Sequence, residues 1–80
     1  MPVRKKTQVF QVIVEQDEEG YYVAECPALR ACYTQGATYA EAIDNIKDVI
    51  ALCLKDLKAR GAEVPNSPQI IGIQPVEVAV

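Results

Sequence analysis

The fold is constrained most by one continuous segment, residues 20–50, which reads GYYVAECPALRACYTQGATYAEAIDNIKDVI. Its pattern predicts a strand, a loop that begins with proline, a short strand, a glycine turn and an amphipathic helix. Proline cannot donate a backbone hydrogen bond to a neighbouring strand, so Pro27 ends the first of these strands. The segment contains no grouping of side chains typical of catalysis. It therefore indicates a small α+β module that works by binding.

A hairpin of two strands is predicted at residues 7–16 and 21–26, with the acidic turn 17–20 between them. In both strands apolar residues recur at every second position, which places them on one face of a sheet. A third, short strand is predicted at residues 31–35, and Gly36 ends it. Phe10, Val12 and Val14 share one face of the first strand, opposite a mixed face that is expected to be half exposed, while Tyr22, Ala24 and Cys26 share one face of the second strand.

A long amphipathic helix is predicted from Thr38 to Arg60. Thr38 and Glu41 have the spacing of a capping box, in which each residue satisfies a backbone N–H group of the other. Gly61 is of the residue type that most often follows a helix, because glycine readily takes positive φ. The residues expected to face the sheet recur every three or four positions; they are Ile43, Ile46, Ile50, Cys53 or Leu54, and Leu57.

A last strand is predicted in residues 69–80, which are rich in isoleucine and valine. The expected fold class is therefore α+β in the order β-β-β-α-β, with a three-stranded antiparallel sheet and this C-terminal strand packed on one long helix. Pro75 shifts the apolar alternation, so the residues beyond it need a different apolar surface. We expect a homodimer or a dimer of dimers with an interface formed by Val76, Val78 and Val80. The alternative is that this segment completes the chain's own sheet or frays.

Length and composition are those of a single small globular domain, with 80 residues of which 50% are hydrophobic. No run of about 18 apolar residues is present, so no membrane span is expected. The basic cluster Arg4, Lys5 and Lys6 is not followed by an apolar stretch, so it is read as a solubilising tail and not as a signal peptide. Three cysteines without a C-x-x-C pair are not a disulfide framework, and the expected location is the cytoplasm.

Catalysis is disfavoured by the residues that are missing. The chain has no histidine, which excludes nucleophiles that depend on a histidine base, and it has no glycine-rich phosphate loop. A two-metal nuclease would need clustered carboxylates. Asp44 and Asp48 share a helix face, but the apolar stripe leaves both pointing mostly to solvent. We therefore expect no catalytic, cofactor-binding or metal-binding residues. We expect Cys53 to pack in the core, and Cys26 and Cys32 either to pack there as well or to leave one of the two exposed. The carboxylates considered for metal binding are Glu15, Glu25, Glu41, Asp44 and Asp48.

Charge is distributed unevenly within the formal net charge of −3. Residues 15–48 carry eight acidic and two basic side chains, a net charge of −6. Such a block suits a basic partner and repels nucleic-acid phosphate, so direct nucleic-acid binding is not expected. The alternative is an acidic face that is simply solvated. The residues predicted to bind the partner are Asp17, Glu18, Glu19 and Glu25.

Two motifs give the chain a resemblance to a known family. Ala24–Leu29 has the pattern Ala-x-x-Pro-x-Leu, and Gly36–Ala42 has the pattern Gly-x-Thr-x-x-Glu-Ala. At this spacing, and in this order of elements, they resemble the HicB-like antitoxin family. The resemblance covers about residues 7–62 and implies a truncated ribonuclease-H-like fold. Many members carry an additional DNA-binding domain, for which no separate segment is expected in residues 1–80.

The resemblance implies a non-catalytic antitoxin that binds and masks a small basic ribonuclease toxin of the HicA type. A stand-alone oligomeric binding or regulatory module with no toxin partner is the alternative. An enzyme or a direct nucleic-acid binder is the third class, and a basic surface stripe would favour it. A gene for a small basic protein next to the gene for this chain would distinguish the first class from the second.

Overall fold

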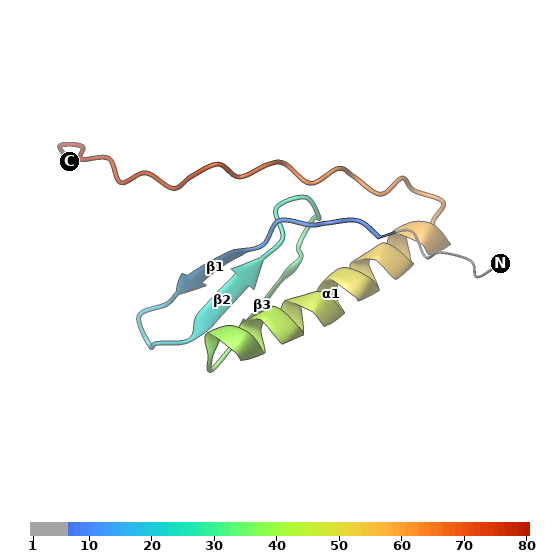
Figure 1. Ribbon diagram of the computed structural model, residues 1–80, viewed down its shortest axis with the longest axis horizontal. Coiled ribbons are helices and arrows are strands. Elements are labelled where there is room, and N and C mark those ends of the chain that lie inside the picture. The colour runs from blue at the N-terminus through green and yellow to red at the C-terminus, as the bar shows by residue number, and fades with distance from the viewer. Residues whose placement is uncertain (1–6) are drawn as a thin grey trace.

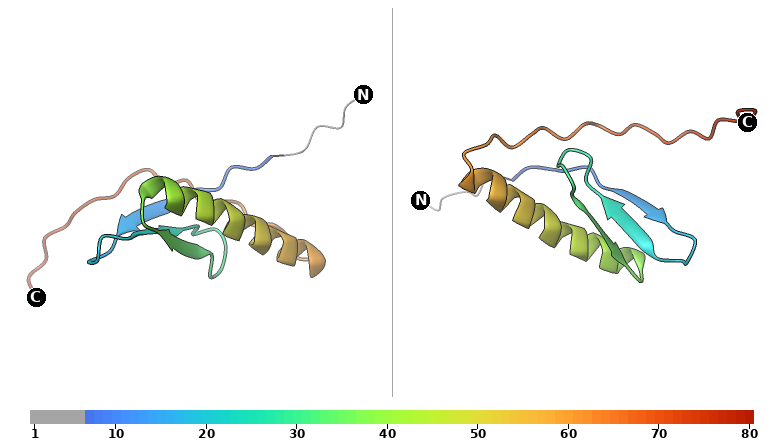
Figure 2. Two further views of the ribbon diagram at one scale, coloured as in Figure 1. Left: turned by 90° about the horizontal axis from the view of Figure 1, so that it is seen from below. Right: turned by 180° about the vertical axis from the view of Figure 1, so that it is seen from behind.

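The computed structural model describes residues 7–80 and forms a three-stranded antiparallel sheet with one long helix on one of its faces (Figures 1 and 2). The basic cluster Arg4, Lys5 and Lys6 lies outside the described residues. The α+β class and the order of the three strands and the helix are as predicted; the ribonuclease-H-like assignment stays a prediction. The elements are β1 (Ile13–Gln16), β2 (Tyr22–Glu25), β3 (Tyr33–Gly36) and α1 (Tyr39–Ala59).

The first strand is shorter than predicted. Residues 7–12 precede β1 and have no partner strand in the described part of the chain, because β2 ends at Glu25 and the chain then turns. Instead of pairing with a strand, this segment forms two hydrogen bonds with the loop that follows α1. The backbone N–H of Gln11 donates to Ser67 Oγ at 2.8 Å, and Gln8 Nε2 donates to the Pro65 carbonyl oxygen at 3.2 Å. The predicted inner face is nevertheless confirmed, since the side chains that pack against the core are Phe10, Val12 and Val14.

The second and third strands enclose a tight connection. Cys26 N–H donates to the Cys32 carbonyl oxygen at 2.9 Å, which closes the loop that begins with Pro27. Ala31 has a φ of 54°, in the left-handed region. This residue was predicted to begin the third strand, but its backbone is not extended, so β3 begins two residues later at Tyr33.

The helix matches its prediction closely. Thr38 is the N-cap, and its hydroxyl oxygen accepts from the backbone N–H of Glu41 at 3.1 Å. Arg60 is the C-cap, and Gly61 follows it with a φ of 68°. No helix of the described residues is long and apolar enough to cross a membrane.

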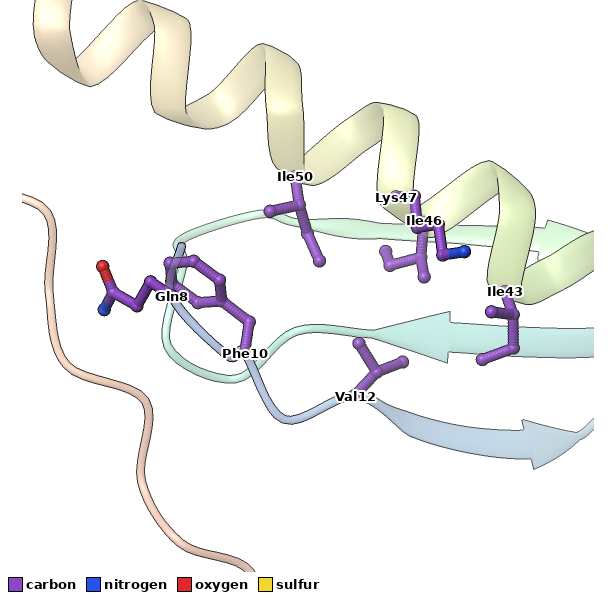
Figure 3. Close-up of a pocket in the computed structure, with 7 residues that line it drawn as sticks. All are labelled: Gln8, Phe10, Val12, Ile43, Ile46, Lys47 and Ile50. Carbon is purple, nitrogen blue, oxygen red and sulfur yellow. The ribbon is translucent and has the colours of Figure 1, made fainter. Parts of the chain in front are cut away.

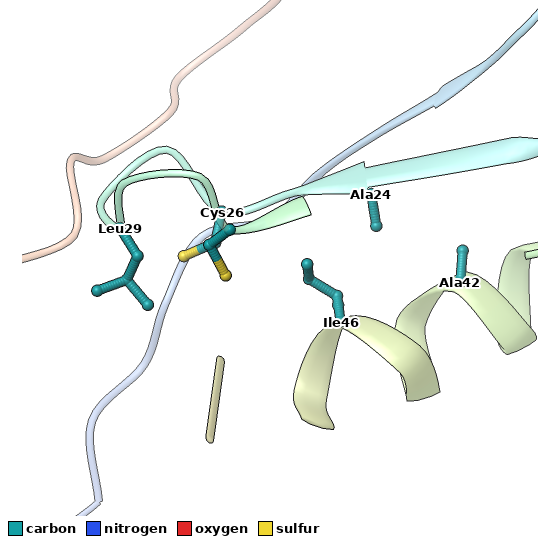
Figure 4. Packing of buried hydrophobic residues seen from close by; sticks show 6 residues of the cluster. Ala24, Cys26, Leu29, Ala42 and Ile46 are labelled. Atoms are coloured by element: carbon teal, nitrogen blue, oxygen red, sulfur yellow. The ribbon is translucent and has the colours of Figure 1, made fainter. Parts of the chain in front are cut away.

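The core lies between the helix and the second and third strands (Figure 4). Ala24 on β2 faces Ala42 and Ile46 on α1, and all three are buried. Small residues at this contact let the helix approach the sheet closely. Gly36 makes the closest approach, because a Cβ atom there would lie 2.6 Å from the backbone nitrogen of Ala42. The buried core is completed by Cys26, Leu29 and Cys32.

The prediction of a C-terminal strand in residues 69–80 is wrong for the structure, where this segment is extended but pairs with no strand (Figure 1). Pro68 and Pro75 cannot donate to a ladder, and after Ser67 the chain moves away from β1. An extended segment becomes a strand only when a neighbour satisfies its backbone groups. The tail elongates the molecule, whose radius of gyration is 15.5 Å. A compact chain of this length would have a radius of gyration of about 12 Å.

Candidate partner-binding surface

The outer face of the sheet, opposite α1, is the candidate surface for a partner. It is formed by the strand residues that alternate with the buried ones. The first row across the three strands is Ile13, Glu25 and Tyr33, which are directly paired in the antiparallel register. Glu25 is exposed, and the Tyr33 side chain is 66% exposed.

A second row lies beside the first and consists of Glu15, Val23 and Gln35. Glu15 and Gln35 are exposed, whereas Val23 is half-buried. The six strand residues of the two rows therefore include two glutamates and no lysine or arginine. Aromatic and aliphatic side chains between carboxylates can bind a partner that is itself partly apolar and basic.

Three of the four predicted partner residues lie in the β1–β2 turn. One of them, Asp17, has a structural role. Its carboxylate oxygen Oδ1 accepts from the backbone N–H groups of Glu19 at 3.0 Å and Tyr21 at 2.9 Å. This arrangement shapes the turn together with Gly20, which has a φ of 90°. A change at Asp17 would alter the turn as well as any contact with a partner.

Glu18 and Glu19 are exposed at the tip of the same turn. Glu25 lies at the other end of β2, so the structure does not bring the four predicted residues together as one cluster. Their role in binding a partner stays a prediction. The turn connects β1 to β2, so it borders the outer face of the sheet. On that face Glu15 lies between the turn and Glu25.

Sequence reasoning did not assign Ile13, Glu15 and Tyr33 to a partner surface. The alternation in each strand indicated which residues point away from the core. It could not show which residues stand opposite one another, because that depends on the register of three strands. The row of Ile13, Glu25 and Tyr33 exists only once the strands are paired.

The helix carboxylates do not form a second site. Asp44 and Asp48 are exposed on α1, which confirms that they point to solvent. Within residues 7–80, no group of three or more cysteine, aspartate and glutamate side chains is placed to hold a metal ion.

The three cysteines pack in or against the core as free thiols. Cys26 and Cys32 are buried, and Cys53 on α1 is half-buried beside them. Burial, with contributions from hydrogen bonds to the neighbouring thiols, raises the pKa of Cys32 to about 12. The thiolate is the reactive form of cysteine, so this thiol is unreactive at neutral pH.

Comparison with known proteins identifies the family of this chain. The sequence profile described as HicB_like antitoxin of bacterial toxin-antitoxin system matches residues 10–76. A UPF0150 protein of Synechocystis sp. is 45% identical over 71 residues, which are 89% of this chain and 96% of that protein. A UPF0150 protein of Thermoplasma acidophilum is 45% identical over 57 residues, or 71% of this chain and 83% of that protein. The chain belongs to the HicB-like antitoxin family of bacterial toxin–antitoxin systems.

Proposed function

We propose that the protein is an antitoxin that binds and masks a small basic ribonuclease toxin of the HicA type. The observation that carries this proposal is the uncovered outer face of the sheet. There Glu15 and Glu25 stand among the exposed Tyr33 and the half-buried Ile13 and Val23. Family membership supports a role in a toxin–antitoxin system. The proposed place of action is the cytoplasm, where free thiols such as those of this chain persist.

Masking follows from complementary charge and shape. A ribonuclease toxin must attract RNA phosphate, so its active face is expected to be basic. Glu18 and Glu19 at the turn would steer that face toward the sheet, because charges at the rim of an interface act mainly on the association rate. Tyr33 would supply a central aromatic contact, a residue type that often dominates binding energy. The toxin would then be unable to reach RNA.

The protein itself is proposed to be non-catalytic. This proposal rests on the exposed, separated carboxylates and on the lack of histidine in the sequence. The assay is RNA and DNA cleavage by the purified protein with magnesium or manganese present. Cleavage that disappears in an Asp44→Asn or Asp48→Asn variant would contradict the proposal.

A second candidate is a stand-alone oligomeric binding module with no toxin partner. The unpaired tail of residues 69–80 favours it, since such a segment suits self-association. Purification of the tagged protein from its native cells, followed by mass spectrometry, distinguishes the two. A small basic protein recovered in stoichiometric amount supports the antitoxin. Recovery of the chain alone, with no growth arrest when its gene is deleted or its neighbours are expressed, supports the alternative.

The binding surface is tested by charge reversal once the co-purified partner is in hand. Glu25→Lys and Glu15→Lys should weaken binding by disrupting the outer face. Glu18→Lys with Glu19→Lys should slow association and reduce its dependence on salt. Glu63→Lys is the matched control, because Glu63 is exposed in the loop after α1. Equal effects of Glu25→Lys and Glu63→Lys would show that only net charge matters and would remove the assignment of this face.

A further inference from the structure

The tail of residues 69–80 exposes an unusual amount of apolar surface. Ile71, Ile73, Val76 and Val78 are 93%, 82%, 75% and 74% exposed, and Val80 is fully exposed. A row of apolar side chains on extended backbone is a template for pairing with another chain. A second chain that pairs with this row would bury it.

An apolar groove of about 400 Å³ lies elsewhere on the molecule, between residues 8–12 and α1 (Figure 3). Phe10 and Val12 point across it toward the helix. It is open because α1 packs mainly against β3 and β2 and contacts β1 least. Its wall on the helix side is formed by Ile43, Ile46, Lys47 and Ile50.

The groove adjoins the free edge of β1. The strand order is β1-β2-β3, so within residues 7–80 the side of β1 away from β2 has no partner strand. The unpaired backbone groups of that edge can form a ladder with an added strand. An added strand there would direct every second side chain toward the inner face of the sheet, at the end of the groove lined by Val12 and Ile43.

The chain's own valines are poorly placed to fill this groove. The hydrogen bonds from Gln8 to Pro65 and from Gln11 to Ser67 fix sequence offsets of 57 and 56 between the two segments, which run in the same direction. Continued along β1, this offset would bring residue 72 beside Gln16, where β1 ends. Residues 76–80 would then lie beyond the hairpin, and in the structure the end of the tail extends past it (Figure 1).

We propose that the tail of one copy lies along the β1 edge of a second copy, with Val76, Val78 and Val80 in that copy's groove. The exchange is reciprocal about a two-fold axis, so each copy gives one tail and receives one. One short strand buries less surface than the roughly 800 Å² per partner of a stable interface, but two exchanged tails double the contact. Glu77 lies in the opposite phase to the valines and faces solvent.

Sedimentation of the full chain and of a chain that ends at Gln74 tests the role of the tail. We expect the full chain to be a dimer at micromolar concentration and the truncated chain to be a monomer with unchanged helical circular dichroism. Val78→Lys should weaken the dimer at least 10-fold without unfolding the monomer, because Val78 is exposed. Leu52→Asp is the matched control; Leu52 is 67% exposed on α1 away from the groove, and its change should leave the dimer intact.

Complementation tests whether the tail enters the groove. Ile43→Lys blocks the groove but keeps the tail, while truncation after Gln74 removes the tail but keeps the groove. Each variant alone should be monomeric, whereas a mixture should form a heterodimer through the one remaining tail and groove. Ile50→Lys serves as a second groove variant if Ile43→Lys does not fold. A monomeric full chain, a dimer that survives truncation, or a mixture that stays monomeric at 100-fold higher concentration than the full-length dimer requires would overturn the proposal.

Discussion

On the face of the sheet that α1 covers, the half near β3 and the half near β1 differ in how much apolar surface the helix buries. On the side of β3, α1 lies so close that Gly36 has no room for a side chain. On the side of β1, the helix leaves a groove bordered by Phe10 and Val12. We call the first the closed side and the second the open side.

The difference follows from the size of the residues at the contact. Because Ala24, Gly36 and Ala42 are small, the helix can pack closely against β2 and β3. A single helix cannot cover three strands at so short a distance, so the inner face of β1 remains partly uncovered. In a domain of 80 residues, a closely packed half thus coexists with a half that suits a second chain.

The largest expected effect comes from removing the same side-chain atoms from the closely packed core and from the uncovered tail. Ile46→Ala should lower the free energy of unfolding by about 2–5 kcal/mol, because Ile46 is buried and its loss leaves a cavity. Ile73→Ala, in the exposed tail, should change it by less than about 0.5 kcal/mol. Urea unfolding at one protein concentration measures both. Similar losses at the two positions would mean that the tail is buried in solution.

A methyl group added at Gly36, on the closed side, and at Gly72, in the tail, gives the next effect. Gly36→Ala would place a Cβ atom 2.6 Å from the Ala42 nitrogen and should cost about 1–3 kcal/mol by forcing helix and sheet apart. Gly72→Ala meets no atom within 4 Å and should be close to neutral. Denaturant midpoints give the comparison. A stable Gly36→Ala variant would show that the closed side can relax.

Single hydroxyl groups allow a smaller test. Thr38→Ala removes the N-cap of α1 and should cost about 1 kcal/mol. Ser67→Ala removes the acceptor for the Gln11 N–H and should cost about 0.5–1 kcal/mol. Amide hydrogen exchange should accelerate at Gln11 in the second variant and at Glu41 in the first. Unchanged exchange at Gln11 would show that residues 8–11 and 65–67 separate readily in the native protein.

The last effect, similar in size to the previous one, concerns whether water reaches the buried thiol of Cys32. The pKa of Cys32 is raised from 9.0 to about 12 in the folded protein, so the folded state holds this proton more tightly than the unfolded state. The associated stability is fully present below pH 9 and is lost as the pH rises toward 12. Between pH 9 and 10 the loss should not exceed about 1.4 kcal/mol. A Cys32→Ala variant should show a shallower decline over this range, and equal slopes would indicate that water reaches the thiol.

Local patterns predicted the elements whose ends are fixed by their own residues. Thr38 and Gly61 mark the helix because a cap and a left-handed residue act over one turn of backbone. Alternation correctly placed Phe10, Val12 and Val14 on the face that packs against the core. Where an element depended on a distant neighbour, its prediction was less accurate, as for residues 7–12 and 69–80.

In the candidate surface, too, features set by residue type were predictable from the sequence, whereas features set by strand pairing were not. Charge alone predicted that acidic residues 18, 19 and 25 bind a partner, and this role stays a prediction. The sequence did not reveal that Asp17 shapes the turn through two backbone hydrogen bonds. Nor did it place Glu25 beside Ile13 and Tyr33, since the register of paired strands is a property of the assembled sheet.

The sequence by itself determined the helix, its caps, the inner face of the first strand, the acidic character of the central segment and the family. These depend on residue type and spacing over a few positions, where propensity and periodicity act directly. Only the tertiary structure decided that the helix lies over β2 and β3, that a groove remains beside β1 and that the tail has no partner strand within the described chain. The physical reason is that strand pairing and helix docking require surfaces from distant parts of the chain, and Gly36 sets their distance by admitting the backbone of α1.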